Sequence, residues 1–408
     1  MKFFLMKWLV CIFAFFCVNS AYAIVGDSTK YKLQHSLGLD FKPAYVLPVN
    51  DFFRGYNVKE TPVRKNFSAH LKYGIKFLPD TYLGEYYPYA VQGIGVGYNS
   101  FNNSAELGNP LSVYVFQSSR IVTLSTRFSL DYEWNFGASF GWKKYDEETN
   151  RYNWVGSKTN AYIGVGILLN WRISSASNLR IGAMLSHYSN GNTRFPNGGV
   201  NTIGGTIGFV HSFGNANRSV KDGTLESDTK HNLIFRRHMS YDVVIYGATK
   251  KKDVTFRRDD MVLVPGSFAI AGLNFIPFYN FSRFFRAGLS LDMQYDESAN
   301  ISRHIANVYP IEEDADIKFY RPPFIEQFSV GFSLRAEVVM PIFSINLGIG
   351  KNFICKGADT DSFYQIFALK ANMTKNLFLH VGYQLYRFKN PNNLMLGVGF
   401  RFNARGGK

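Results

Sequence analysis

Alternation with a period of two is the feature that most constrains the fold of this chain. In the stretch AYIGVGILLNWRI, residues 161–173, the odd positions are all apolar and the even positions are mostly small or polar. The stretches 343–350 and 393–402 alternate in the same way. Side chains two apart in a strand share a face, so these segments predict β-strands with one apolar face.

The first residues predict export. Residues 1–23, MKFFLMKWLVCIFAFFCVNSAYA, combine two lysines, an apolar run and a small-x-small ending. This is the pattern of a signal peptide that is removed at Ala23. No other segment has eighteen uninterrupted apolar residues, so no transmembrane helix is expected. Cys355 then remains as a lone cysteine, which leaves no intramolecular disulfide.

An exported chain of alternating strands predicts a transmembrane β-barrel. Only a closed barrel lets strands cross a membrane with every backbone group paired. A soluble β-sandwich also alternates, but it does not need outer faces so rich in aromatic residues, which make up 17% of this chain. We therefore expect an all-β protein of the cell outer membrane. The net charge of +15 then indicates contact with anionic outer-membrane lipids rather than nucleic acid.

Pattern counting gives about 16 strands in total. Eight candidates precede residue 214, near 31–48, 67–79, 89–101, 111–124, 126–142, 159–173, 178–189 and 201–213. A polar linker, 214–231, separates this region, 24–213, from a second β-rich region, 232–408, in which 298–325 reads as a long loop. The polar break favours two eight-stranded barrels in tandem, and the lack of a sharper linker favours one large barrel. We give the second argument slightly more weight.

The loop lengths assign the two ends of the barrel. Residues 174–177 form a tight turn, whereas 143–158 and 190–200 are longer. Outer-membrane barrels have short periplasmic turns and longer external loops, so we expect the two longer segments outside the cell.

The stretch SHYSNGNTRFPNGGVN, residues 186–201, carries the candidate chemistry. In the preceding strand the lipid-facing residues have odd numbers, which puts His187 and Ser189 side by side on the outer wall. The next strand has the same parity, so Asn201 shares that face. A polar cluster against lipid is unfavourable unless it has a use. We expect these three side chains to converge near the external end.

This set of side chains matches the needs of ester cleavage. A serine hydroxyl becomes a nucleophile when a histidine takes its proton, and a third group usually fixes the imidazole. The developing oxyanion needs hydrogen-bond donors, for which Asn190, through its side chain or its backbone N–H, and Asn197 are candidates.

The segment His187-Tyr188-Ser189-Asn190, followed by Pro196-Asn197-x-Gly199-x-Asn201, resembles the motif of the bacterial outer-membrane lipid A 3-O-deacylases. The likeness covers at most residues 31–213, and its specific part is 186–201. It implies an eight-stranded barrel that removes an ester-linked acyl chain from lipid A, part of lipopolysaccharide, as a serine hydrolase. Ser189 would be the nucleophile, His187 the base and Asn201 the group that orients His187.

One position departs from that family. Some members carry a glutamate at the position of Asn201, and asparagine can orient a histidine but cannot stabilise imidazolium by charge. Asp131 and Glu133 have inward parity and are poor substitutes. Arg194 flanks the motif and is our candidate for binding the lipid A phosphates, together with Lys143, Lys144, Arg151 and Lys158.

Other functions remain open. A porin or transporter without catalysis is the alternative from another class, and a phospholipase is the alternative among enzymes. The remaining histidines lack metal-ligand spacing, and there is no phosphate-binding loop or nucleotide fingerprint, so no metal and no cofactor are expected. The sequence assigns no role to residues 232–408 and no oligomeric state.

Overall fold

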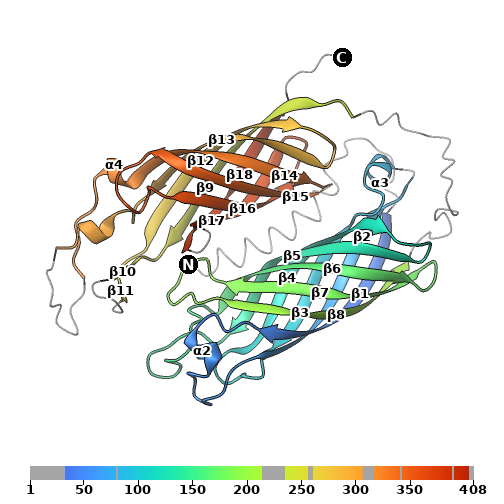
Figure 1. Cartoon of the computed structure of the whole chain (residues 1–408), viewed down its shortest axis with the longest axis horizontal. Helices are drawn as coiled ribbons and strands as arrows, with labels where there is room; N and C mark the ends of the chain where they lie inside the picture. Colours follow the sequence, from blue (N-terminus) through green and yellow to red (C-terminus); the bar gives the residue numbers. More distant parts are fainter. Residues whose placement is uncertain are drawn as a thin grey trace. The chain divides into compact units, whose positions relative to one another are not determined.

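The structure, a computed structural model, describes residues 33–79, 81–213, 235–255, 261–306, 317–340, 342–387 and 390–403. It contains two closed antiparallel barrels of eight strands each, one in each half of the chain (Figure 1). The all-β barrel class is confirmed. The preference for one large barrel is wrong, because the eighth strand pairs back onto the first, as in the pair Leu39–Phe209, and this closes the first barrel before residue 214.

The first barrel follows the expected strands closely. Its strands are β1 (Leu33–Val46), β2 (Lys65–Phe77), β3 (Val91–Ser100), β4 (Gly108–Thr123), β5 (Phe128–Trp142), β6 (Thr159–Arg172), β7 (Ser177–Ser189) and β8 (Val200–Phe213). Each strand pairs with its neighbours in sequence, and β1 pairs with both β2 and β8. All eight strands expected before residue 214 are present, with bounds that differ by a few residues.

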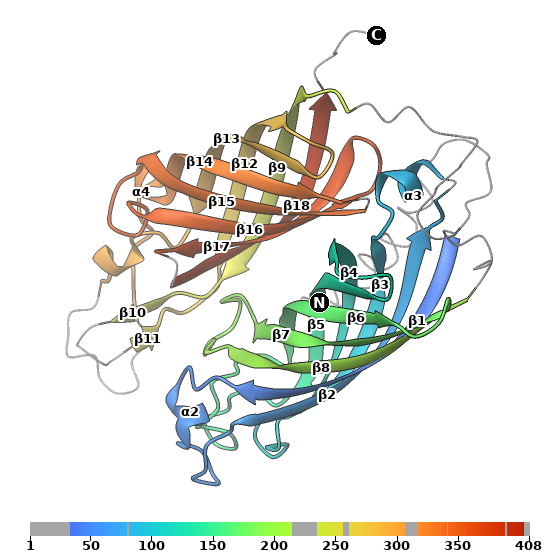
Figure 2. The same cartoon turned by 45° about the vertical axis from the view of Figure 1, so that its right-hand side comes forward.

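The two ends of the first barrel differ in the length of their connections. The loop end carries 47–64, with the short helix α2 (Asp51–Arg54), and the loops 101–107, 143–158 and 190–199. The turn end carries 124–127, 173–176 and a longer connection with α3 (Tyr82–Tyr86). Figure 2 shows α2 and α3 at opposite ends of this barrel. At the turn 173–176 the Ser174 hydroxyl accepts hydrogen bonds from the backbone N–H groups of Ala176 and Ser177.

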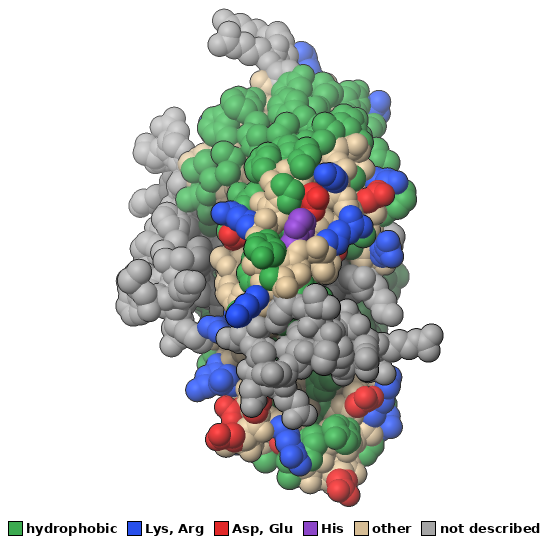
Figure 3. Space-filling model, turned by 90° about the vertical axis from the view of Figure 1, so that its left-hand side faces the viewer, with side chains coloured by type: hydrophobic (Ala, Val, Ile, Leu, Met, Phe, Trp, Pro, Cys, Tyr) green, Lys and Arg blue, Asp and Glu red, His purple; other side chains and the backbone are tan. Residues whose placement is uncertain are grey.

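Strand alternation separates an apolar outer wall from a polar lumen. In β1, Leu37, Leu39 and Phe41 are exposed, whereas Ser36 and Asp40, at the alternate positions, are buried. Hydrophobic side chains cover continuous areas of the surface in the space-filling view (Figure 3, green). This is the arrangement expected for strands that face lipid on one side.

Two layers of side chains occupy the loop-end half and the middle of the lumen of the first barrel. Toward the loop end lie buried aromatic rings, among them Trp142, Tyr162 and Tyr188. In the middle, the Glu133 carboxylate lies 2.9 Å from the Lys72 ammonium and 3.0 Å from the Arg180 guanidinium, and Asp40 pairs with the same two cations. Glu133 therefore points inward, as its parity predicts.

The second barrel has the same strand order. It consists of β9 (His238–Lys250), β12 (Phe268–Asn280), β13 (Phe285–Asp296), β14 (Phe328–Val339), β15 (Phe343–Ile354), β16 (Phe363–Asn372), β17 (Leu377–Tyr386) and β18 (Asn390–Asn403), with β18 closing onto β9. A separate two-stranded sheet joins β10 (Asp253–Thr255) and β11 (Met261–Leu263). The described part of the expected loop 298–325 holds the 3-10 helix η2 (Ile301–Arg303) and the start of α4 (Phe324–Gln327).

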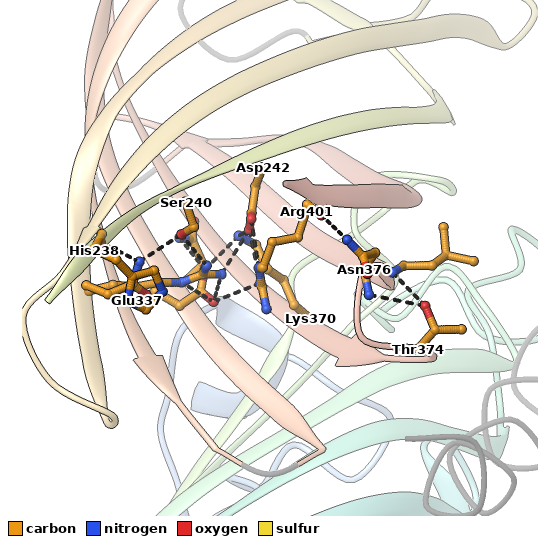
Figure 4. Close-up of polar contacts among 12 residues, drawn as sticks. His238, Ser240, Asp242, Glu337, Lys370, Thr374, Asn376 and Arg401 are labelled. Carbon is orange, nitrogen blue, oxygen red and sulfur yellow. Dashed lines mark hydrogen bonds and ion pairs between the residues drawn. The ribbon is translucent and has the colours of Figure 1, made fainter. Parts of the chain in front are cut away.

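The second barrel also has a charged lumen. Lys370 lies 3.0 Å from Asp242 and 2.6 Å from Glu337, and Arg401 lies 2.8 Å from Asp242 (Figure 4). These four side chains come from β9, β14, β16 and β18 and meet in the interior.

Two expectations concern residues that the structure does not describe. The predicted signal peptide, residues 1–23, and the predicted polar linker, residues 214–231, both lie outside the described ranges. Within the residues that the structure describes, no helix is long and apolar enough to cross a membrane.

Candidate active site

Strand pairing brings the three outward polar side chains of the first barrel together. His187 and Ser189 end β7, and Asn201 is the second residue of β8. The register of the two strands puts His187 directly opposite Asn201. The apolar neighbours on this face, Leu185 and Ile203, are about half exposed, so the three polar side chains lie on the outer wall at the loop end. We call His187, Ser189 and Asn201 the triad.

Two hydrogen bonds connect the triad in series. The side-chain oxygen of Asn201 lies 2.6 Å from Nδ1 of His187, and Nε2 of His187 lies 2.9 Å from the Ser189 hydroxyl oxygen. An amide oxygen only accepts hydrogen bonds, so Nδ1 must carry the ring proton when His187 is neutral. The lone pair of Nε2 then faces the Ser189 hydroxyl. This is the arrangement in which a histidine can remove the proton of a serine.

Gly199 adopts a backbone conformation next to the imidazole that few residues other than glycine can adopt. Its φ is +66°, in the left-handed region that L side chains rarely adopt. A Cβ built on Gly199 would lie 3.4 Å from Cε1 of His187 and 3.5 Å from the Tyr188 carbonyl oxygen. Both distances are ordinary van der Waals contacts, so the positive φ, rather than a lack of space, favours glycine at this position.

The two oxyanion candidates contact each other. The backbone N–H of Asn190 donates to the side-chain oxygen of Asn197 at 3.0 Å, and Asn190 itself is buried. This bond occupies the backbone N–H that the sequence suggested as a donor. Asn197 lines a small cavity together with Ser189, Trp154 and Gly199. Of the two residues, the amide nitrogen of Asn197 is the better candidate donor.

A second loop supports the site, and this packing was not predicted from the sequence. In the loop 143–158, the Trp154 carbonyl accepts from the backbone N–H of Gly198 at 3.0 Å, and Val155 forms an isolated bridge with Asn197. Val155 is buried in the same apolar cluster as Tyr188 and Val200. The segment that follows Ser189 is therefore held from the neighbouring loop.

The candidate phosphate-binding cations lie outside the triad. Arg194 is exposed in the loop 190–199, and the two hydrogen bonds that join the triad do not involve it. Lys143 donates to the Ala105 carbonyl, and the Arg151 guanidinium stacks over the ring of Tyr152. Lys144 and Lys158 are exposed in the loop 143–158, which also contains Lys143 and Arg151.

The second barrel has apolar and aromatic residues at the corresponding positions. On the outer face of β17 the last two residues are Tyr383 and Leu385, where β7 has His187 and Ser189. Opposite Tyr383 in β18 lies Leu394, where β8 has Asn201. In addition, no group of three or more histidine, cysteine or acidic side chains that could hold a metal occurs among the residues that the structure describes.

Two family models match the chain. The model described as "Lipid A 3-O-deacylase (PagL)" matches residues 116–210, which include the triad, and the model described as "Acyloxyacyl hydrolase, C-terminal domain" matches residues 239–404. Together they cover well over half of the sequence. No curated protein sequence matches the chain.

Solved structures resemble the chain only weakly. Neisserial surface protein A (NspA) is 11% identical with a TM-score of 0.29, over 44% of this chain and 97% of that protein. The siderophore receptor PirA from Pseudomonas aeruginosa is 8% identical with a TM-score of 0.25, over 92% and 81%. These scores are too low to bear on fold or function.

Proposed function

The chain belongs to the lipid A 3-O-deacylase family, hydrolases that act on ester bonds in the outer membrane, and we propose that its first barrel deacylates lipid A as a serine esterase. The observation that carries this proposal is the hydrogen-bonded series from Asn201 through His187 to Ser189. The mechanism assigns a role to each member.

In the first half of the reaction, Ser189 Oγ attacks the acyl carbonyl carbon while its proton moves to Nε2 of His187. The carbonyl oxygen becomes an oxyanion, for which the Asn197 amide is the proposed donor. The intermediate collapses when the bond to the sugar oxygen breaks, and that oxygen takes the proton from His187. The products are a free sugar hydroxyl and an acyl ester on Ser189.

In the second half, water replaces the sugar. His187 removes a proton from water, and the resulting hydroxide attacks the acyl-enzyme carbonyl. Collapse of this intermediate breaks the bond to Ser189 Oγ, which regains its proton from His187. A fatty acid leaves and the serine is restored. Asn201 keeps Nδ1 protonated throughout, so that Nε2 performs both proton transfers.

The position of the triad fits a lipid substrate. The three polar side chains lie among exposed apolar residues on the outer wall, including Leu185 and Ile203. An acyl chain can lie along this wall while its ester reaches Ser189, so the lipid need not enter the barrel. Arg194 and the lysines of the loop 143–158 remain candidates for contact with the phosphates of lipid A.

A porin function has less support. In the first barrel the lumen is crossed by the paired charges of Asp40, Lys72, Glu133 and Arg180, all of which are buried. The lumen of the second barrel is crossed in the same way by the cluster around Lys370. Paired charges that cross the interior leave little room for a continuous water-filled path from one end to the other.

The deciding experiment is mass spectrometry of lipid A after incubation with the purified full chain in detergent. The parent should release one ester-linked acyl chain, and Ser189→Ala and His187→Ala should release none above background. Ser177→Ala is a matched control, because Ser177 lies on the same face of β7 and its hydroxyl contacts His211 at 3.0 Å at the turn end. This control should retain full activity.

Three results would contradict the proposal. Cleavage of phospholipid but not lipid A would mean that the substrate is wrong. Unchanged cleavage by Ser189→Ala would exclude the serine mechanism. If the parent cleaves nothing, while the chain conducts ions in planar bilayers, the porin alternative is correct.

A further inference from the structure

The turn end of the first barrel contains a cavity of about 1000 Å³, which is separate from the triad at the loop end. Inward-facing positions of its walls are occupied by small residues: Ser36, Gly38, Gly74, Ser118 and Ser212 all line it. At the loop end the corresponding space is filled by rings such as those of Tyr162 and Tyr188. The lumen is therefore open at one end and packed at the other.

The lining of this cavity is strongly cationic. Besides Lys72 and Arg180, four basic side chains line the cavity, namely Lys76, Arg120, Arg127 and Arg172, and the acidic side chains in the lining are Asp131 and Glu85. Lys76 and Arg120 are half-buried in the wall, whereas Arg127 and Arg172 are exposed at the rim. None of the four basic groups forms a direct ion pair with an acid among the described residues, and Asp131 is the nearby acid that interacts with Lys76 and Arg120 at longer range.

The floor of the cavity is charged as well. Lys72 and Arg180 line it, and each forms ion pairs with Asp40 and Glu133, which are not part of the lining. These pairs cross the lumen between the cavity and the ring-filled loop end.

Two buried donors in this region have no acceptor in the described structure. They are the Nε–H groups of Arg120 and Arg180. Arg120 also lies with its guanidinium 4.2 Å from the centre of the Tyr89 ring, which fixes its plane. A buried N–H without a partner is unfavourable, so an acceptor bound in the cavity would stabilise the arrangement.

We propose that this pocket binds an anion that carries phosphate groups. Planar guanidinium groups match phosphate oxygens in pairs, and several cations around one pocket favour a multiply charged ligand over a single carboxylate. The ligand would enter from the turn end and would leave the triad untouched. Its source is either a soluble phosphate ester or a phospholipid headgroup.

The test uses the full chain in a zwitterionic detergent and isothermal titration calorimetry with inorganic pyrophosphate. Binding should be detectable and should weaken as salt is added. The double variant Lys76→Gln/Arg120→Gln should bind at least about ten-fold more weakly. Lys59→Gln/Lys65→Gln removes the same charge from exposed positions at the loop end and should bind within about two-fold of the parent. Circular dichroism should give the same strand content for all three proteins.

A second arm separates the two sources of phosphate. The same proteins are titrated with glycerol 3-phosphate. In a separate measurement they are placed in nanodiscs of phosphatidylcholine, and the affinity for pyrophosphate is compared with and without phosphatidylglycerol in the nanodisc. Binding of the soluble ester assigns a soluble ligand, and a response to phosphatidylglycerol alone assigns a headgroup. The proposal is wrong if neither phosphate source nor pyrophosphate binds, or if the loop-end control loses as much affinity as the cavity variant.

Discussion

The side-chain oxygen of Asn201 lies 2.6 Å from Nδ1 of His187, so an uncharged amide occupies the position next to the imidazole. An amide fixes which nitrogen carries the proton, but it does not offset the positive charge that develops on the ring. Within the proposed mechanism, this contact controls both the orientation of His187 and the rate of the chemical step.

Substitutions at Asn201 test this role. Asn201→Ala removes the orienting oxygen and should lower kcat for lipid A deacylation at least about ten-fold. Asn201→Asp keeps the length of the side chain and adds a negative charge, which should raise kcat by up to about ten-fold. Both rates come from single time courses with lipid A at saturating concentration. An aspartate variant that is slower than the parent would contradict the argument.

Gly199 should tolerate no side chain. Gly199→Ala must hold alanine at a positive φ, which costs about 1–2 kcal/mol, and relief of this strain would move the loop backbone that contacts the His187 ring. We expect a loss of deacylation of about ten-fold with the barrel intact. Gly205→Ala in β8 is the control, because Gly205 does not have a positive φ and the only atom within 4 Å of its new methyl group is a carbonyl oxygen at 3.9 Å. Equal losses in the two variants would argue against specific packing at His187.

The buried charges of the first barrel should dominate its stability. Glu133→Gln leaves Lys72 and Arg180 with less compensation in the interior and should lower the free energy of unfolding by about 3–5 kcal/mol. Asp51→Asn breaks a pair in which both side chains are more than half exposed and should cost less than about 1 kcal/mol. Guanidinium unfolding in detergent measures both, and similar losses would refute the comparison.

Acid should loosen a loop of the second barrel. The hydrogen bond from His304 holds the pKa of the Glu326 carboxyl below its ordinary value of 4.5. Because the folded value is the lower one, this contact stabilises the loop above pH 4.5 and the contribution disappears as pH falls through the folded pKa. Hydrogen exchange around Ile301–Arg303, corrected for intrinsic rates, should lose protection between pH 6 and pH 3. In Glu326→Gln the change should be much smaller.

The faces of the strands could be predicted from the sequence, but the closure of the barrels could not. Alternation in β6 and β7 is a local property, so each outward residue could be assigned from its neighbours. Closure depends on the pairing of β1 with β8, for example Leu39 with Phe209, and no periodicity encodes which distant strand is the partner. This is why the preference for one large barrel was wrong.

The candidate site likewise has a part that could be predicted from the sequence and a part that could not. His187 and Ser189 are two apart on one strand, so their common face followed from parity, and the short connection to β8 put Asn201 within reach. The contact of Asn190 with Asn197 and the support from Trp154 and Val155 arise only when two loops pack together. Neither loop carries a repeating pattern from which that packing could be read.

The outward direction of Ser189 has a consequence for how a substrate arrives. A lipid in the surrounding leaflet meets this wall by lateral diffusion, so the encounter is a search in two dimensions. The rate would then depend on the mole fraction of lipid A around the protein rather than on its amount per volume. Dilution with an inert lipid would slow turnover even when the total lipid A in the sample stays constant.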